Sequence, residues 1–266
     1  MSNLLSTPGS YWRSSRSHRY SLLFALPLLV AYETLVLLLS HGPTGGIRNG
    51  ADAVLQEIFY AIAGRYGPML FGVCLVGVGA WLVGRDLRAH GMQLRWSMFA
   101  WMLLESFALA IVFGVVVATI TARIVTPLSH LTGTTVSMGR LPDTMVASLA
   151  LAPVERLGLW TRLMVSIGAG LYEELLFRVI LVSGIVLVAE RVLGWRPRVA
   201  GAWAVALSAL IFSAFHYIGP YGDPLELRSF VFRTIAGLAF SALYLLRGFG
   251  ITAWTHALYD ILLLVA

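Results

Sequence analysis

The hydrophobic pattern of the chain consists of long apolar runs separated by short polar segments that carry arginines. An α-helix rises about 1.5 Å per residue, so a run of about 20 apolar residues is long enough to cross the hydrocarbon core of a bilayer. The pattern therefore predicts an all-α fold, a polytopic bundle of seven transmembrane helices. We expect these spans at about 20–40, 68–83, 98–120, 163–188, 199–218, 227–246 and 250–265.

Two segments between these runs have a different pattern. Residues 51–64 show apolar positions at helical spacing, which predicts a helix lying at the membrane interface. Residues 121–160 are less hydrophobic and contain three prolines, so we expect a loop with short interfacial or re-entrant helices there. Within this loop, 144–152 is apolar enough to leave an eighth span open. The first apolar run lacks a convincing cleavage site, and we interpret it as an uncleaved span rather than a signal peptide.

The composition excludes an ordinary soluble domain. Hydrophobic residues make up 58% of the chain and charged residues 12%, and the mean hydropathy is +0.81. A chain with so few polar residues could not cover its apolar surface in water. The single cysteine, Cys74, excludes an intrachain disulfide and is interpreted as a small buried apolar residue.

The charge pattern is that of a membrane protein rather than a nucleic-acid-binding protein. All 19 basic residues are arginines, the net charge is +6, and the arginines lie in short clusters between the apolar runs. With seven spans, ten arginines fall on the side of the N-terminus and eight on the opposite side, which favours a cytoplasmic N-terminus by a small margin. The exclusive use of arginine and the basic N-terminus fit the plasma membrane of a prokaryote.

The run 163–188 is unusual because it carries three ionisable side chains at its centre, Glu173, Glu174 and Arg178. Each such side chain costs about 2.5 to 3.5 kcal/mol at mid-bilayer, so the three need partners, water or a chemical task. Glu174 and Arg178 are four residues apart with the acid on the N-terminal side, which predicts an ion pair. Glu173 is left without a local cation, as suits a general acid or base. The alternative is that both acids pair with Arg178 and only fix helix packing.

Two later runs carry histidines at comparable positions. Phe212 and His216 lie four residues apart, as do His256 and Asp260, so each pair shares one helix face. Two histidines and an acid on separate membrane helices could meet the glutamates in one pocket. A lone histidine in a membrane helix is more often a packing or hydrogen-bonding residue. The presence of two histidines together with an acid pair favours a functional site.

Together the three motifs resemble a known family. EELLFR at 173–178, FSAFH at 212–216 and HALYD at 256–260 are similar to the three signature motifs of the CAAX protease and bacteriocin-processing family of intramembrane glutamic endopeptidases. The order, spacing and helical placement of the motifs agree with that family. We therefore divide the chain into N-terminal transmembrane spans, 1–160, and a catalytic transmembrane core, 161–266, within one integral membrane unit.

The resemblance implies hydrolysis of a peptide bond without a covalent intermediate. Glu173, together with His216, would activate a water molecule for attack on the scissile carbonyl. His256 and its partner would stabilise the oxyanion that forms on the carbonyl oxygen. The resemblance implies no cofactor and no metal ion.

The same resemblance assigns supporting roles to three further residues. Glu174 and Arg178 would hold the helix and the base in place. Asp260 stands where some family members have asparagine. Because an ionised aspartate would repel an oxyanion, we expect Asp260 to orient His256, or to donate a hydrogen bond only when it is protonated.

The expected spans place these groups at different depths. Counted along the helices, Glu173 lies about 15 Å from the outer edge of its span, His216 lies near the outer end of its own, and His256 lies about 9 Å from the inner edge. Groups at such depths would not meet. We expect the turn at 247–250 to dip into the membrane, while helix tilt and other span boundaries are the alternatives.

Two other functions stay open on the sequence alone. Glu173, His216 and His256 could supply a zinc site with an open position for water, although no His-Glu-x-x-His motif is present and Arg178 would oppose a cation. A transporter or an immunity-type binding protein could use the buried charges as a relay or docking site, although no inverted repeat is visible.

The partners expected for a protease of this kind are a membrane-anchored protein or peptide as substrate and the lipid bilayer as environment. Nucleic acid is not expected as a partner. Family resemblance does not carry substrate specificity with it, so prenylation of the substrate does not follow from the sequence, and neither does the oligomeric state.

Overall fold

The structure is a computed structural model that describes residues 8–42, 45–91, 93–132, 157–219 and 222–265. Within these ranges every regular element is a helix and there is no strand, as the hydrophobic pattern predicts for a polytopic bundle. The segment 144–152, where an eighth span was left open, lies outside the described residues.

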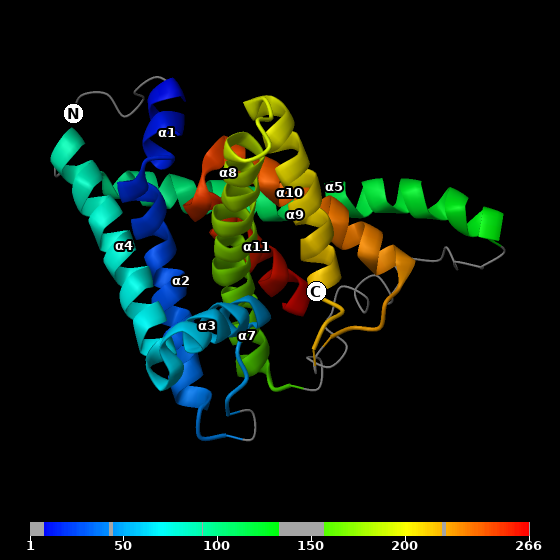
Figure 1. The fold of residues 1–266 in the computed structure, drawn as a ribbon, viewed down its shortest axis with the longest axis horizontal. Helices are drawn as coiled ribbons and strands as arrows, with labels where there is room; N and C mark the ends of the chain where they lie inside the picture. Colours follow the sequence, from blue (N-terminus) through cyan, green and yellow to red (C-terminus); the bar gives the residue numbers. More distant parts are fainter. Residues whose placement is uncertain (1–7, 43–44, 92, 133–156, 220–221, 266) are drawn as a thin grey trace.

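In the N-terminal half of the chain, one short helix lies crosswise to the long helices. Its elements are α1 (Pro8–Ser15), α2 (His18–Leu39), α3 (Gly50–Ala63), the 3-10 turn η1 (Gly64–Tyr66), α4 (Gly67–His90) and α5 (Trp96–Thr132). Asn49 caps the start of α3 by accepting the N–H of Ala51 on its side-chain oxygen. Figure 1 shows α3 lying crosswise to α4, so the segment expected at the interface forms a helix of its own.

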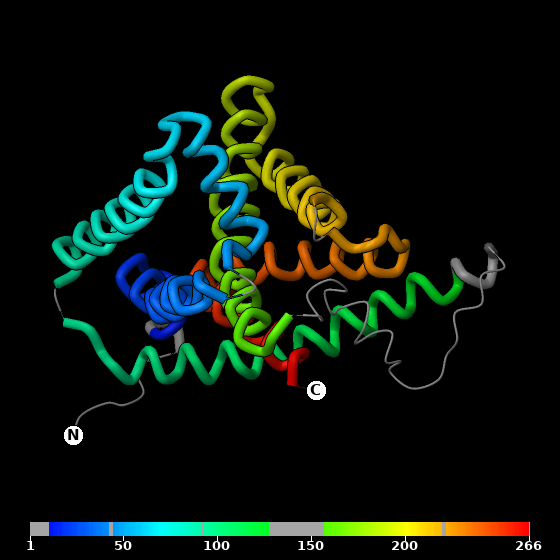
Figure 2. Tube along the Cα trace, turned by 90° about the horizontal axis from the view of Figure 1, so that it is seen from below, coloured from blue at the N-terminus to red at the C-terminus, as the bar shows by residue number. Residues whose placement is uncertain are grey.

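The C-terminal half contains one long helical run that passes through the middle of the molecule (Figure 1). This run consists of α7 (Leu159–Gly168), η3 (Ala169–Glu173), η4 (Leu175–Val182) and α8 (Ser183–Arg191). It is followed by α9 (Pro197–Phe215), α10 (Leu227–Arg247) and α11 (Phe249–Val265). In Figure 2, α5 runs along one edge of the molecule, and α4 (cyan) and α9 (yellow) flank the central run.

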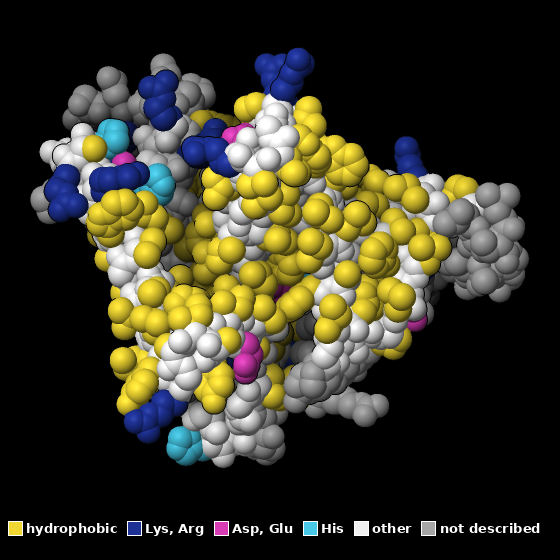
Figure 3. Space-filling model, viewed as in Figure 1, with side chains coloured by type: hydrophobic (Ala, Val, Ile, Leu, Met, Phe, Trp, Pro, Cys, Tyr) yellow, Lys and Arg dark blue, Asp and Glu magenta, His cyan; other side chains and the backbone are white. Residues whose placement is uncertain are grey.

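Among the described residues, five stretches are long and apolar enough to cross a membrane, namely His18–Leu39, Gly50–His90, Trp96–Pro127, Pro197–Phe215 and Leu227–Arg247. They contain five of the seven expected spans. The remaining two fall on the run from α7 to α8, which is divided by π-helical segments, and on α11, which has 17 residues. Figure 3 shows hydrophobic side chains over most of one face, with basic side chains near its upper and lower ends, as is typical of a surface surrounded by lipid.

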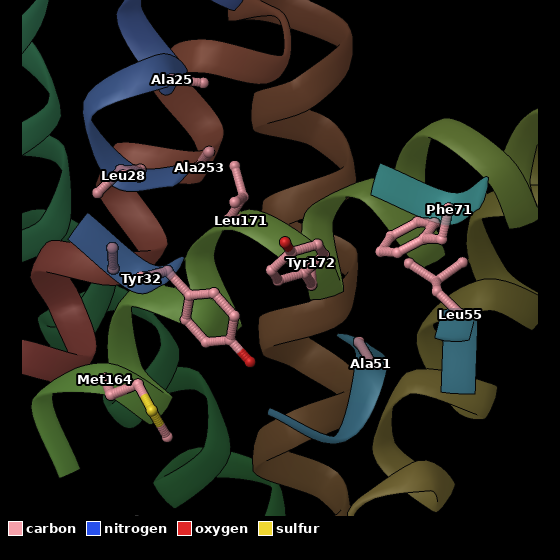
Figure 4. Packing of buried hydrophobic residues seen from close by; sticks show 11 residues of the cluster. Ala25, Leu28, Tyr32, Ala51, Leu55, Phe71, Met164, Leu171, Tyr172 and Ala253 are labelled. Atoms are coloured by element: carbon pink, nitrogen blue, oxygen red, sulfur yellow. The ribbon is translucent and has the colours of Figure 1, made fainter. Parts of the chain in front are cut away.

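The helix α11 lies at the centre of the packing. It contacts α2, α5, α7, η3 and α10. Its buried residues contribute to three separate apolar clusters: Ala253 and Ala257 to the first, Tyr259 to the second and Ile251 to the third. Figure 4 shows the first cluster, where Ala253 lies beside Leu171 of η3. The position of α11 therefore depends on helices from both halves of the chain.

The turn between α10 and α11 lies inside the protein. Gly248 ends α10 with a φ of +80°, a conformation that favours glycine. The N–H of Gly250 donates to the hydroxyl of Ser21 in the first turn of α2, 2.8 Å away. Arg247 is 2% exposed and its Nε lies 2.5 Å from Glu105. The turn is thus partly buried in the protein, and the expected dip of 247–250 into the membrane stays a prediction.

Gly170 lies where the central run and α11 approach each other closely. A Cβ on Gly170 would lie 2.4 Å from the carbonyl oxygen of Ala253 and 2.6 Å from the backbone nitrogen of Ala257. Because backbone atoms cannot step aside as side chains do, we expect Gly170→Ala to lower the free energy of unfolding by about 1–3 kcal/mol. Equilibrium unfolding of the detergent-solubilised chain measures the change.

The matched control for this substitution is Gly184→Ala on α8, where an added Cβ meets nothing within 4 Å. Alanine is the better helix former by about 1 kcal/mol, so we expect this variant to keep or raise the stability. An equal response of the two variants would contradict the close approach at Gly170.

Candidate active site

The two glutamates lie on a helical segment that the sequence pattern did not predict. We expected an ordinary α-helix over 163–188, but η3 and η4 are π-helical, with hydrogen bonds that span one residue more per turn. Such segments are rare and often lie at functional sites. Glu173 is 6% exposed and Glu174 is fully buried, so both carboxyl groups lie inside the helix bundle.

The carboxylate of Glu173 has two different oxygens. Oε1 accepts a hydrogen bond from the side-chain nitrogen of Asn49 at 3.1 Å. Oε2 lies 3.9 Å from Nε2 of His216 and has no hydrogen-bond partner among the described residues. A separation of 3.9 Å is too long for a direct hydrogen bond. A polar gap of this length between two groups is one that a water molecule can bridge.

The ring of His216 has a defined orientation. Its Nδ1 lies 2.8 Å from the carbonyl oxygen of Phe212, one turn earlier in α9. Because a carbonyl only accepts, Nδ1 carries the proton, and in the neutral ring Nε2 is the unprotonated nitrogen that faces Glu173. Asp223 holds the end of α9 in place. Its N–H donates to the carbonyl of His216, and its carboxylate pairs with Arg233 of α10.

Glu174 joins two cationic or protonatable side chains through one oxygen. Its Oε1 lies 3.2 Å from Nη1 of Arg178 and 2.7 Å from Nδ1 of His256. The Arg178 guanidinium is 1% exposed, lies 4.6 Å above the ring of Phe212 and donates through Nη2 to the carbonyl of Gly237. The expected ion pair between Glu174 and Arg178 is therefore present, and Arg178 in addition connects the central run to α9 and α10.

His256 is held mainly by Glu174 rather than by Asp260. Its ring stacks on Phe240 with the centroids 4.3 Å apart, and Nδ1 forms the hydrogen bond to Glu174. Asp260 lies 3.7 Å from Nε2 of His256, beyond hydrogen-bond distance. The direct hydrogen bond to His256 thus comes from Glu174, while Asp260 lies within ion-pair distance on the other side of the ring, and its role in orienting His256 stays a prediction.

The six predicted residues thus form two adjacent groups. Glu173 and His216 face each other, while Arg178 and His256 contact Glu174 and Asp260 lies beside His256. The alternative in which both acids pair with Arg178 does not describe the arrangement, because Glu173 contacts Asn49 and faces His216. In the part of the chain that the structure describes, no group of three or more His, Cys, Asp or Glu side chains is arranged to hold a metal ion, and the zinc alternative stays open to the metal-removal test below.

The residue that sequence reasoning missed is Asn49. An asparagine directly before an apolar helical segment is a recognisable N-cap signal, and α3 does begin there. Its contact with Glu173 joins positions 124 residues apart. No local pattern reports a contact across that distance, so only the folded chain could reveal it.

A scan against protein-family models matched part of this chain. Residues 155–262 match the family described as type II CAAX prenyl endopeptidase Rce1-like. All three motifs lie within the matched residues, and the match confirms the resemblance that those motifs predicted. Comparisons with curated proteins and with solved structures found no match. The matched residues exclude α2 and α3, although α3 begins at the asparagine that contacts Glu173.

Proposed function

We propose that Glu173 is the catalytic base of a glutamic intramembrane protease, because residues 155–262 match the family described as type II CAAX prenyl endopeptidase Rce1-like, a family of membrane endopeptidases. The observation that carries the proposal is the unpartnered Oε2 of Glu173, buried and 3.9 Å from Nε2 of His216. Two acceptor atoms that face each other across such a gap suit a water molecule that donates one proton to each.

In the proposed reaction, Glu173 removes a proton from this water as the water oxygen attacks the scissile carbonyl carbon. His216 accepts the second hydrogen of the water in a hydrogen bond and so orients its lone pair. The carbonyl oxygen becomes an oxyanion in the tetrahedral intermediate. When the carbon–nitrogen bond breaks, the proton held by Glu173 passes to the leaving amine, so the products are a carboxylic acid and an amine.

The second group of residues, around Glu174 and His256, would stabilise the oxyanion. His256 donates from Nδ1 to Glu174, and when the ring carries both protons its Nε2–H is free to donate to the oxyanion. Arg178 and Glu174 would keep this ring in place, because Arg178 pairs with Glu174 and joins the central run to α9 and α10. Asp260, which is 27% exposed, would act on the charge of the His256 ring from its other side.

The proposed substrate is a membrane-anchored protein or peptide. Both glutamates are buried in the bundle, so a scissile bond has to enter between the helices to reach them. A chain with five helices able to cross a bilayer meets its substrate in or at the lipid. We propose the plasma membrane of a prokaryotic cell as the location.

The test of this proposal compares the termini of membrane proteins by mass spectrometry. Cells that carry the wild-type chain are compared with cells that carry Glu173→Gln at equal expression. We expect a small set of cleaved termini that are present with the wild-type chain and absent with the variant. No difference between the two, with the variant folded, would favour the transporter or immunity-type alternative and overturn the protease proposal.

Metal removal separates the glutamic mechanism from the zinc alternative. Arg178 lies beside Glu174 in the site, and its charge opposes a bound cation. We therefore expect enzyme prepared free of metal with a chelator to cleave a substrate from the termini comparison at the wild-type rate. The measurement is the cleavage rate together with the zinc content. A rate that falls with the chelator and returns with stoichiometric zinc would contradict a metal-independent base.

A further inference from the structure

We propose that Asn49 is a positioning residue of this site, which holds one oxygen of Glu173 and leaves the other as the reacting oxygen. The inference rests on the proposed role of Glu173 and adds a residue from the N-terminal half, outside the matched domain. Asn49 is 3% exposed, and its side-chain nitrogen lies 3.1 Å from Oε1 of Glu173.

The orientation of the Asn49 amide follows from its second contact. Its side-chain oxygen accepts the N–H of Ala51 at 2.9 Å, as the cap of α3. The oxygen of the amide is therefore committed to the helix, and the nitrogen has to face Glu173. An amide nitrogen only donates. The nitrogen of Asn49 therefore donates to Glu173, whose ionised carboxylate accepts. One side chain thus begins α3 and contacts the proposed base.

A hydrogen bond to Tyr32 of α2 fixes the position of the Asn49 backbone. Its N–H donates to the hydroxyl oxygen of Tyr32 at 3.0 Å, and the same hydroxyl donates to Asp52 at 2.8 Å. Figure 4 shows Tyr32 between Met164 and Tyr172, with its hydroxyl directed toward the start of α3. Gly168 allows this approach, because a Cβ there would lie 2.5 Å from the Tyr32 ring and 2.8 Å from Cβ of Asn49.

A buried charge network fixes the start of α3 in turn. Asp52 is fully buried and accepts from Tyr32, from Gln56 at 2.7 Å and from Arg48 at 2.7 Å. Burial of the Arg48 guanidinium acts to lower its pKa, but the hydrogen bond to Asp52 and the charges of Asp52 and Glu33 outweigh it, so the pKa of Arg48 is raised. Arg48 therefore stays charged, and Asp52 remains a fixed anchor for the first turn.

The consequence for the proposed chemistry is that the two oxygens of Glu173 are not interchangeable. The donor on Oε1 prevents the carboxylate from turning, so Oε2 stays directed at His216. A carboxylate free to rotate would present the water to His216 only part of the time. A preorganised base avoids that loss, which would appear in kcat rather than in substrate binding.

Two substitutions at position 49 separate the donor from the helix cap. Asn49→Ser keeps a good N-cap for α3 but removes the donor to Glu173. We expect kcat to fall about 10- to 100-fold, the range of a hydrogen bond to a charged group, with KM unchanged and the stability lowered only by the lost bond to Glu173. Asn49→Ala removes both contacts, so we expect the same fall in kcat together with a lower unfolding midpoint. Both are measured with the purified full chain and a substrate from the termini comparison.

A third substitution gives a signature that a structural role would not produce. Asn49→Asp keeps the shape and the cap but places a second carboxylate beside Glu173. A protonated carboxyl group can donate to Glu173 and an ionised one cannot. We therefore expect the activity of Asn49→Asp relative to the wild type to rise as the pH falls, while the ratio for Asn49→Ser stays constant.

The outcomes distinguish this inference from the proposed function. Wild-type kcat in Asn49→Ser, with a loss of stability alone in Asn49→Ala, would reduce Asn49 to a helix cap and overturn the inference while Glu173→Gln is still inactive. Cleavage by Glu173→Gln at the wild-type rate would overturn the proposed function itself, whatever the variants at position 49 do.

Discussion

The purified Glu173→Gln variant is expected to cleave its substrate about 10³- to 10⁴-fold more slowly than the wild-type chain, near the upper end of what a general base contributes. Glutamine has nearly the same volume and can accept the hydrogen bond from Asn49 through its amide oxygen. It cannot take a proton from water. The loss would therefore lie in kcat, with KM and the stability close to the wild-type values, and single-turnover kinetics measure it.

Two further variants serve as controls for the expected loss of kcat. Glu173→Asp keeps a carboxylate but withdraws it by one methylene, so we expect an activity between those of the wild-type chain and Glu173→Gln. Glu190→Gln makes the same chemical change at a partly exposed position of α8 and is expected to leave the rate unchanged. A rate for Glu173→Gln within tenfold of the wild type would exclude Glu173 as the base.

The Arg178→Met variant is expected to lose about 3–5 kcal/mol of unfolding free energy, the range for breaking a buried ion pair by removing one partner. Methionine fills much of the space of the arginine stem but leaves the carboxylate of Glu174 buried without its cation. Oε2 of Glu174 already lacks a hydrogen-bond partner among the described residues, so in this variant the carboxylate keeps the hydrogen bond from His256 on Oε1 but loses its cation. Equilibrium unfolding in mixed micelles with a denaturing detergent measures the loss.

The matched control is Arg191→Met, the same substitution at an exposed position of the same helical run, for which we expect a change within about 0.5 kcal/mol. The double variant Glu174→Gln, Arg178→Met removes both charges, so we expect it to regain part of the lost stability. If Arg178→Met were no less stable than Arg191→Met, Arg178 would not be the connection between the central run, α9 and α10 that the distances indicate.

The hydrophobic pattern was sufficient to place most of the helices, because the apolar run needed to cross a bilayer is long and its signal is local. The same locality explains the ion pair of Glu174 and Arg178, which depends only on two residues one turn apart. The three motifs predicted a resemblance to the CAAX protease family, and a model of that family matches residues 155–262. The proposed roles of their residues remain to be tested by the variants above.

The tertiary structure decided how these residues are joined. Glu174 binds His256 across 82 positions and Asn49 binds Glu173 across 124, while Asp260, one turn from His256, lies beyond hydrogen-bond distance from it. The π-helical turns around the glutamates also had no signal in the hydrophobic pattern. The physical reason is that periodicity along one helix reports which face is apolar, whereas a contact between helices depends on how closely their backbones approach. Here glycines at 168, 170 and 250 set that approach, through the space that their missing Cβ atoms leave to another helix.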